Sequence, residues 1–300
     1  MPVTFFEEAA ALIRAGRLVA FPTETVYGLG ANALDPAAVR RIFEAKGRPA
    51  TSPLIVHVSS TEMARRYVTA WPETAERLAA RHWPGPLTLV LPKTREIPDE
   101  VTAGLPTVGI RAPAHPIALE LIERAGVPIA APSANRFTEL SPTCAEHVRR
   151  SLGDRVDLIL DGGSTPVGIE STVLSLAGER PVLLRPGMVS RGEIEEITGV
   201  VEVLVTGGPG AHAAPGMHQR HYSPRTPLLL VRGRPDRPGR GVYLKHGETM
   251  PANPRDYAAA LYATLHRLDA EQLDWIAVEI PPDGEAWMGI RDRLRRAATL

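Results

Sequence analysis

The segment 21-FPTETVYGLGANA-33 gathers short polar side chains directly after an apolar run. Residues 18–21 are apolar and predict a short buried strand. Thr23, Glu24 and Thr25 follow at once with hydroxyl and carboxyl groups. A cluster of hydrogen-bonding side chains at the end of a buried strand is a candidate binding site.

Two further motifs place polar or charged groups at the predicted ends of elements. Lys46 and Arg48, in 46-KGRP-49, could bind a phosphate or could neutralise the C-terminus of a helix. Ser133 and Asn135, in 131-APSAN-135, follow a predicted buried strand and could face a ligand or form an ordinary turn. Taken alone, each motif favours the structural interpretation.

Several well-known site patterns do not occur in the sequence. Gly28 and Gly30 lack the third glycine of a dinucleotide-binding loop, and there is no P-loop or G-x-S-x-G motif. The histidines show no H-E-x-x-H spacing. The single cysteine, Cys144, cannot form an internal disulfide or a cysteine metal site, and is predicted to be a packed side chain.

Composition limits the class of protein. A hydrophobic fraction of 44% is ample for a buried core in 300 residues. The 34 basic residues balance 34 acidic ones, so net charge predicts no polyanionic partner. No apolar run approaches the roughly 20 residues that a membrane span needs, and the N-terminus lacks the basic region of a signal peptide. We therefore expect a cytoplasmic protein without a membrane partner, which also suits a single cysteine.

Hydrophobic periodicity predicts a mixed α/β domain in the first two thirds of the chain. Strands and helices occur without strict alternation, which favours a mixed rather than a purely parallel sheet. Helices are expected at 4–15, 36–45, 64–80 with a break at Pro72, 116–125 and 143–152; strands are expected at 18–21, 54–58, 87–91, 108–111, 127–131, 158–161, 171–176 and 182–185.

Residues 205–227 are rich in glycine and proline and are predicted to form an exposed linker. A smaller α/β unit is expected after them. Its strands are predicted at 228–231, 241–244 and 276–279, and its helices at 257–268 and 286–298.

The order of the motifs resembles that of the YrdC/Sua5 family. In chain order these are FPTETVYGLG, KGRP, PLIVHV, WPGPLTLVL, VGIRAPAHP, PSAN with ELSPT, GIESTV, LLRPG and 215-PGMHQRHYSP-224. The resemblance covers about residues 5–224 by motif and the remainder by architecture. It implies a YrdC-like catalytic domain with a twisted mixed sheet and flanking helices at 1–204, a linker acting as a lid at 205–227, and a Rossmann-like Sua5 domain at 228–300.

The resemblance also implies a function. Two-domain members of this family make threonylcarbamoyl-AMP and pyrophosphate from L-threonine, bicarbonate or CO2, and ATP. The product serves the N6-threonylcarbamoyl modification of adenosine 37 in tRNA, so the implied partners are the downstream transferase machinery and, transiently, tRNA. Mg2+ is implied together with ATP, because Mg2+ usually binds through substrate phosphates.

Site residues follow from the positions that match the family motifs. The resemblance implies that L-threonine is bound by Thr23, His57, Arg111, the backbone near Ala131, and Ser171. It implies a catalytic K-x-R…S-x-N set of Lys46, Arg48, Ser133 and Asn135. ATP would be bound by these four together with Thr107, Ser141, Arg185 and Tyr222. Glu24 and Tyr27 carry no predicted catalytic role.

The sequence departs from the family pattern in two places. Arg136-Phe137-Thr138 follows PSAN where Ser-Gly is common, which leaves the shape of that loop open. Gln219 stands in the linker where an aromatic residue is common, which leaves the contacts of the lid open.

Two other functions stay open at this point. One is a nucleotide- or RNA-binding regulatory module without turnover, although an aromatic fraction of 5% offers few stacking platforms for RNA. The other is a carbamoyl transferase of the hydrogenase-maturation kind, which would need acylphosphatase and zinc-finger segments that this sequence does not show.

Overall fold

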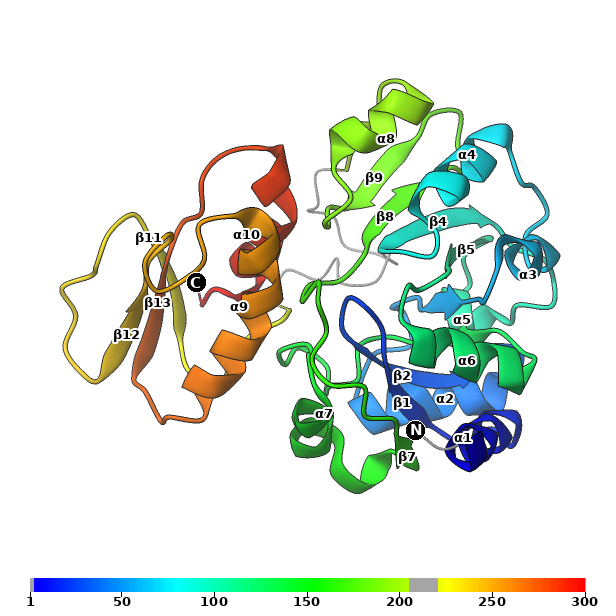
Figure 1. Ribbon diagram of the computed structural model, residues 1–300, viewed down its shortest axis with the longest axis horizontal. Coiled ribbons are helices and arrows are strands. Elements are labelled where there is room, and N and C mark those ends of the chain that lie inside the picture. The colour runs from blue at the N-terminus through cyan, green and yellow to red at the C-terminus, as the bar shows by residue number, and fades with distance from the viewer. Residues whose placement is uncertain (1–2, 205–220, 300) are drawn as a thin grey trace.

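The structure, a computed structural model, describes residues 3–204 and 221–299. It contains a ten-stranded sheet with flanking helices and a three-stranded sheet formed by the C-terminal part of the chain (Figure 1). Most of the expected linker, including Gln219, lies outside the described residues.

The large sheet is mixed, as the sequence predicts. Its strand order is β10-β9-β8-β4-β5-β3-β6-β2-β1-β7. It contains antiparallel pairs, such as β4 with β5, and parallel pairs, such as β3 with β5. The strands are β1 (Val19–Pro22), β2 (Tyr27–Asn32), β3 (Ile55–His57), β4 (Leu87–Pro92), β5 (Thr107–Arg111), β6 (Ile129–Ala130), β7 (Leu158–Ile159), β8 (Thr172–Ser175), β9 (Val182–Arg185) and β10 (Glu202–Val203).

Helices cover both faces of this sheet, so its central strands are buried on both sides. In and beside β1, Leu18 and Ala20 belong to one hydrophobic core, whereas Val19 and Phe21 belong to another. The alternation follows from the two-residue period of a strand. The helices are α1 (Val3–Arg14), α2 (Pro36–Lys46), α3 (Thr61–Arg66), α4 (Glu73–His82), α5 (Asp99–Thr102), α6 (Pro116–Ala125), α7 (Ala145–Leu152) and α8 (Arg191–Thr198).

Strand β2 of this sheet was not predicted from the sequence. β2 follows the polar turn after β1 and pairs with it antiparallel, with Val19 opposite Gly30. A Cβ atom on Gly30 would lie 2.7 Å from Cε1 of Phe21 and 2.8 Å from Cγ2 of Ile129. Glycine is therefore required for packing at this position. Because glycine is uncommon in strands, the sequence here does not have the composition that predicts one. Helices α5 and α8 and strand β10 were also not predicted.

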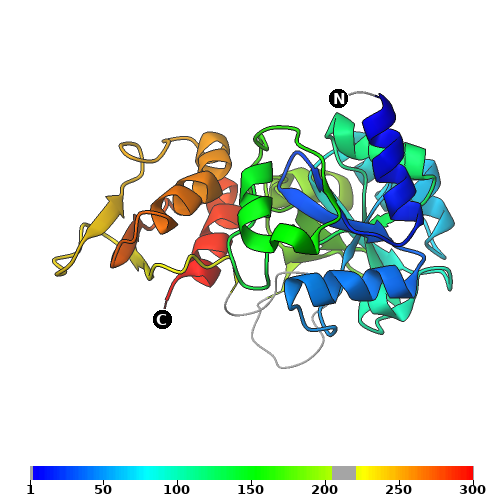
Figure 2. The same cartoon turned by 90° about the horizontal axis from the view of Figure 1, so that it is seen from below.

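The C-terminal unit is a small parallel sheet with two helices, as expected. The strand order is β11-β13-β12, and both pairs are parallel. Its elements are β11 (Leu228–Val231), β12 (Gly241–Leu244), α9 (Pro254–Asp269), β13 (Trp275–Glu279) and α10 (Met288–Ala297). Figures 1 and 2 show α9 and α10 between this sheet and the larger domain. Within the described residues, no helix is both long and apolar enough to cross a bilayer.

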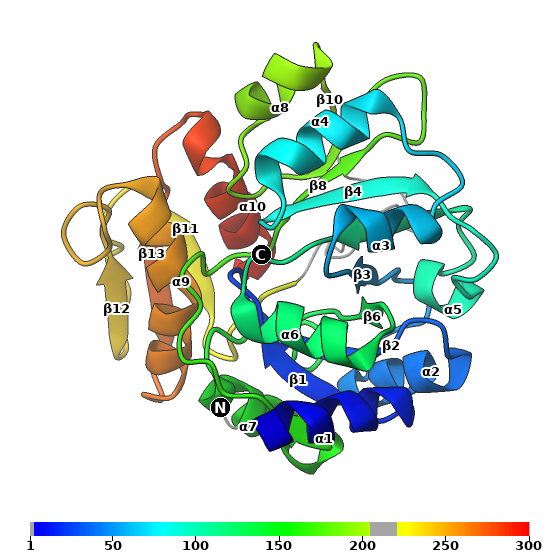
Figure 3. The same cartoon turned by 45° about the vertical axis from the view of Figure 1, so that its right-hand side comes forward.

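The two units share a hydrophobic core. Val26, Leu140 and Ile169 of the larger domain belong to the same buried cluster as the side chains of α9 and α10. The backbones come close at Gly168, because a Cβ atom there would lie 2.3 Å from the carbonyl oxygen of Ala258 in α9. Figure 3 shows α10 beside the ends of β4 and β8. The C-terminal helices are thus packed directly against the larger domain.

Replacing Gly168 by alanine tests this contact. The residue has φ of +79° and no space for a side chain. We expect Gly168→Ala to lower the free energy of unfolding by about 2–4 kcal/mol, measured by urea denaturation. Gly163→Ala is the matched control, because φ is +77° there and nothing lies within 4 Å of the added atom. Equal losses in the two variants would contradict a steric role for Gly168.

Candidate active site

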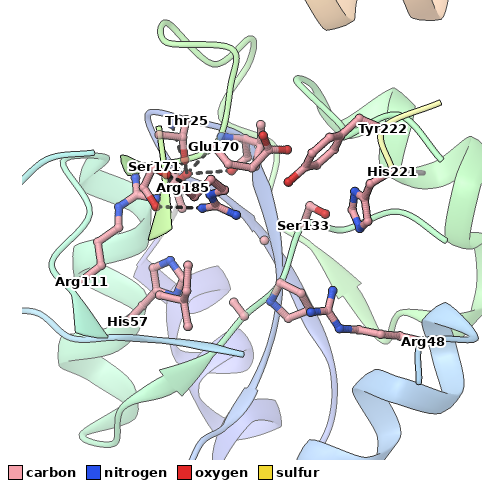
Figure 4. A pocket seen from close by; sticks show the side chains of 16 residues that line it. Thr25, Arg48, His57, Arg111, Ser133, Glu170, Ser171, Arg185, His221 and Tyr222 are labelled. Atoms are coloured by element: carbon pink, nitrogen blue, oxygen red, sulfur yellow. Dashed lines mark hydrogen bonds between the residues drawn. The ribbon is translucent and has the colours of Figure 1, made fainter. Parts of the chain in front are cut away.

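A polar pocket lies where the ends of β1, β3 and β5 meet the loops after β6 and before β8 (Figure 4). It encloses about 520 Å³ of space, including its opening to solvent. Most of the residues predicted from the sequence motifs are brought together here. The lining residues are Thr23, Thr25, Val26, Gly28, Arg48, Ile55, His57, Arg111, Ala131, Pro132, Ser133, Glu170, Ser171, Arg185, His221 and Tyr222.

The turn between β1 and β2 is organised by the hydroxyl of Thr23. The Thr23 Oγ1 atom donates to the carbonyl of Val26 at 2.7 Å and accepts from the amides of Thr25 and Val26 at 3.2 and 3.3 Å. A short side chain that bonds its own backbone two or three residues on closes such a turn. Thr23 therefore both lines the pocket and fixes the shape of its rim.

Arg111, the last residue of β5, is buried in the pocket wall. Its Nη2 atom lies 2.6 Å from Oε1 of Glu24 in an ion pair, and its Nη1 atom donates to Oγ1 of Thr25 at 3.0 Å. Its Nε atom donates to the carbonyl of Gly85 at 3.1 Å. Glu24 also accepts from the amide of Ala114 at 3.0 Å. These contacts fix the orientation of the guanidinium, and they give Glu24 a positioning role behind it.

His57, the last residue of β3, is a neutral group of the pocket. It is only 4% exposed, and burial, with a smaller contribution from the positive charge of Arg111, lowers its pKa to about 3. Its Nδ1 atom is buried without a hydrogen-bond partner within the described structure. His57 thus presents an uncharged imidazole beside a buried cation.

Ser171 and Arg185 form a second polar wall. The Ser171 hydroxyl lies 2.8 Å from Oγ1 of Thr88 and accepts from Nη2 of Arg185 at 3.2 Å. The Nε atom of Arg185 donates to the carbonyl of Ser171 at 3.1 Å. Burial lowers the pKa of Arg185. Arg185, at the end of β9, is therefore hydrogen-bonded to Ser171, which directly precedes β8.

Arg48 reaches the pocket because α2 ends in a left-handed turn at Gly47. Asp35 caps the start of the helix, and Gly47 has φ of +62°. The Arg48 Nη2 atom donates to Oγ of Ser52 at 2.7 Å and to the carbonyl of Pro53 at 3.1 Å. Burial lowers the pKa of Arg48 to about 10, so the guanidinium stays charged at neutral pH.

Lys46 supports the pocket from behind and is not part of its lining. Its Nζ atom donates to the carbonyl oxygens of Ser133, at 2.5 Å, and Asn135. The ammonium is buried, and burial, reinforced by Arg48, lowers its pKa well below the ordinary value. Lys46 thus holds the loop after β6 in place through main-chain contacts.

Asn135 also stabilises this loop. Its Nδ2 atom donates to the carbonyls of Arg136 and Glu139, each at 2.9 Å. Its Oδ1 atom is buried and makes no hydrogen bond within the described structure. Ala131 and Ser133 line the pocket, whereas the Asn135 amide bonds within the loop.

Glu170 is a pocket residue that the sequence analysis missed. It precedes Ser171 in the GIESTV motif and is 7% exposed. The Ser141 hydroxyl donates to its Oε1 atom at 2.5 Å, and Nε of Arg293 donates to its Oε2 atom at 2.6 Å. Ser141 itself does not line the pocket. The only available signal was an acidic residue inside an otherwise apolar and hydroxyl-bearing motif.

Tyr222 lies on the same side of the pocket as Glu170 (Figure 4). Its backbone has φ of +61°, and its side chain is 1% exposed. The neighbouring amides hold it from both sides: His221 donates to the carbonyl of Arg296 at 3.1 Å, and Ser223 to that of Thr138 at 2.9 Å. A non-glycine residue keeps such a conformation only where its surroundings fix it.

Two residues of the polar motifs lie away from this pocket or serve the fold. Thr107 is at the opposite end of β5 from Arg111 and lines a separate cavity with Val90 and Val108. Tyr27, for which no catalytic role is predicted, donates to the carbonyl of Gly163 at 2.7 Å.

The charges of the pocket suit an anionic ligand. Arg48, Arg111 and Arg185 approach it from three different segments, and all three are buried. Guanidinium groups match the geometry of carboxylate and phosphate oxygens. In the part of the chain that the structure describes, no group of three or more histidine, cysteine or acidic side chains could hold a metal ion.

Two family models match consecutive parts of the chain. The Sua5, YciO and YrdC model, described as "Telomere recombination", matches residues 11–187. A model described as "Threonylcarbamoyl-AMP synthase, C-terminal domain" matches residues 189–299.

Known proteins are similar to the chain over nearly its full length. It is 44% identical to the threonylcarbamoyl-AMP synthase of Pyrococcus abyssi over 97% of this chain and 93% of that protein. It is 44% identical to the threonylcarbamoyl-AMP synthase of Bacillus subtilis over 97% of this chain and 92% of that protein. The crystal structure of P. abyssi Sua5 complexed with L-threonine matches with a TM-score of 0.92 and 42% identity, over 98% of this chain and 94% of that chain.

The low pKa of His57 predicts a measurable pH dependence of stability. The folded-state pKa of about 3 lies below that of an exposed imidazole. Below about pH 6.5 the unfolded chain therefore binds a proton that the folded chain does not, and stability is lost as the pH falls towards 3. We expect His57→Gln to reduce this loss by about 1 kcal/mol per pH unit, measured by urea denaturation between pH 6 and 4. Identical slopes in the variant and the wild type would contradict the burial of a neutral His57.

Proposed function

The chain belongs to the Sua5–YciO–YrdC family, and on that premise we propose that its polar pocket is the active site of a threonylcarbamoyl-AMP synthase. The enzyme joins L-threonine, a one-carbon unit from bicarbonate or CO2, and the adenylyl group of ATP, and releases pyrophosphate. The observation that supports this most strongly is that three buried arginines and several hydroxyls converge on one pocket in a chain similar over its full length to enzymes of that name.

We assign the threonine half of the pocket to Thr23, His57, Arg111 and Ser171, with the backbone at Ala131. Threonine carries a carboxylate, an ammonium and a hydroxyl. A fixed guanidinium suits the carboxylate, and short hydroxyl side chains suit the remaining polar groups. A neutral His57 can share the site with the substrate ammonium without charge repulsion, which a protonated imidazole could not.

The ATP half is assigned to Arg48, Ser133, Arg185 and Tyr222. Arg48 and Arg185 supply charge for phosphate oxygens and Ser133 supplies a hydroxyl. We assign Lys46, Asn135 and Ser141 to the same half as positioning residues. Lys46 and Asn135 contact the loop after β6 and would act through it. Ser141 donates to Glu170 and would act through that carboxylate. Thr107 is the one predicted nucleotide residue for which the geometry offers no support.

The proposed reaction needs no covalent enzyme intermediate. The ammonium of threonine first loses a proton to solvent. The free amine then attacks the carbon of CO2 or bicarbonate, giving a carbamate with loss of a second proton or of water. A carbamate oxygen then attacks the α-phosphorus of ATP, and the bond to the pyrophosphate leaving group breaks. Catalysis would rest on positioning and on the cations that stabilise the charge developing on the phosphates.

Mg2+ would enter with ATP as part of the substrate. Glu170, a carboxylate that lines the pocket, already accepts hydrogen bonds from Ser141 and Arg293. A metal ion held by phosphate oxygens needs no cage of protein ligands. Mg2+ would neutralise phosphate charge, whereas the arginines would orient the phosphates.

We further propose the cellular setting that the family implies. The product would pass to the transferase machinery that modifies adenosine 37 of tRNA, with a transient tRNA contact, in the cytoplasm. We retain the division of the chain into a catalytic domain at 1–204, a linker at 205–227 and a smaller domain at 228–300 as a proposal.

Pyrophosphate release from ATP tests the proposed reaction. We expect release that requires both L-threonine and bicarbonate, because neither the carbamate nor the adenylate can form without them. Pyrophosphate release that does not depend on L-threonine would indicate another acceptor of the adenylyl group. Tight binding of ATP or RNA without release would favour the regulatory module over the enzyme.

The same assay with Arg111→Lys tests the threonine half. Lysine keeps a charge beside Glu24 but loses the planar fork that meets a carboxylate. We expect the KM for threonine to rise at least about tenfold while the KM for ATP changes little. Arg40→Lys, an exposed site on α2, is the matched control. An unchanged KM for threonine would contradict the assignment of Arg111 to the threonine half of the pocket.

A further inference from the structure

Arg293 is a buried, charged residue whose side chain extends from the C-terminal unit to the larger domain. It belongs to α10 in the C-terminal unit, and its side chain is 0% exposed. Its Nε atom donates to Oε2 of Glu170 at 2.6 Å, and its Nη2 atom donates to the Glu170 carbonyl at 3.1 Å. Its Nη1 atom donates to the carbonyl of Pro186 at 2.9 Å. Three of its bonds thus reach residues of the larger domain that flank the pocket.

The other contacts of Glu170 determine the geometry of its ion pair with Arg293. Burial alone would raise the pKa of the Glu170 carboxyl, but the charges of Arg293 and Arg185, together with the hydrogen bonds from Ser141 and Arg293, lower it. The hydroxyl of Tyr262, in α9, donates to Oε2 at 3.3 Å. A buried ion pair contributes little net stability compared with apolar side chains of similar size. Its clearest effect here is to fix the geometry of the groups that it joins.

Those groups face the ATP half of the pocket. The Tyr222 ring lies with its centroid 5.5 Å from Cζ of Arg293, within the range of a cation–π contact. Ser141 donates to the other oxygen of Glu170, at 2.5 Å. In Figure 4, Glu170 and Tyr222 lie along one side of the pocket, and His57 lies across from them. Arg293 therefore supports one half of the pocket from behind.

The sequence allows α10 to come close enough for these bonds. Gly289 lies one helical turn before Arg293 and packs against Gly187. A Cβ atom on Gly289 would lie 2.9 Å from the carbonyl oxygen of Gly187, a backbone atom that cannot move aside easily. Any larger residue at position 289 would push α10 away from the loop that carries Pro186.

We propose that Arg293 is a positioning residue for the reaction, and that the C-terminal domain completes the ATP half of the pocket through it. By holding Glu170 and the ring of Tyr222, Arg293 would fix the surface on which the nucleotide rests. Thr23, His57 and Arg111 have no hydrogen bond or ion pair with Arg293 among those of the described residues. This inference rests on the function proposed above.

The test compares the two substrates in Arg293→Met. Methionine has a similar length but no charge or donor. We expect the KM for ATP to rise about tenfold and the KM for L-threonine to stay within about twofold of wild type, both from pyrophosphate release. Arg295→Met, an exposed site on the same helix, is the matched control and should change neither value. A merely structural role would change both KM values together or neither of them.

Two further variants keep the test decisive if Arg293→Met folds poorly. The double variant Glu170→Gln/Arg293→Met removes both charges of the pair, so it should recover thermal stability relative to the single variant while the KM for ATP stays raised. Gly289→Ala keeps both charges but displaces α10, and it should raise the KM for ATP selectively. ATP kinetics like those of wild type in any folded variant of Arg293 would overturn the proposal.

Calorimetry of ATP and L-threonine binding to the wild-type chain and to Arg293→Met distinguishes a failure of the proposed function from a failure of the role proposed for Arg293. If the wild type binds neither ligand, the proposed function fails and the kinetic comparison has no basis. If it binds both ligands and Arg293→Met retains full affinity for ATP, the function stands and the role of Arg293 is wrong.

Discussion

The carboxylate of Glu170 is the point on which the arrangement of the pocket depends. It is buried, and it accepts hydrogen bonds from Ser141 in the loop after β6, from Tyr262 in α9 and from Arg293 in α10. An unpaired charge at this depth would cost several kcal/mol, so the three segments must meet there for the chain to fold as it does. The C-terminal domain is therefore bound to the wall of the pocket and not merely attached by a linker.

The cations around the pocket follow a common rule. Arg111 donates to the carbonyl of Gly85, Arg48 to that of Pro53 and Arg185 to that of Ser171, while Lys46 donates to the loop at Ser133. Each side chain thus anchors a neighbouring loop through a main-chain oxygen, and the three arginines keep positive charge near the cavity. This explains why basic residues in short motifs can serve the fold and the site at once. It also explains how a chain with no net charge gathers three buried arginines at one pocket.

The sequence predicted the architecture wherever periodicity was clear. The mixed sheet, the C-terminal unit and the helix that ends before Arg48 followed from apolar spacing, proline and glycine. Strand β2 escaped prediction because Gly30 is required by the packing of Phe21, a tertiary constraint with no local signature. The family motif implies a catalytic role for Lys46, but its main-chain contacts with Ser133 and Asn135 join segments far apart in the chain, and no local pattern predicts them. The partnership of Glu170 with Arg293 spans 123 residues, so no local pattern could predict it.

The most direct test of the whole account is a crystal structure of this chain with L-threonine and a non-hydrolysable ATP analogue. The account predicts the threonine carboxylate within about 3 Å of the Arg111 guanidinium. It predicts the triphosphate against Arg48 and Arg185, with the Tyr222 ring in contact with the nucleotide and Arg293 still bound to Glu170. A nucleotide bound away from Arg48 and Arg185, or a threonine on the side of Tyr222, would contradict the division of the pocket into two halves.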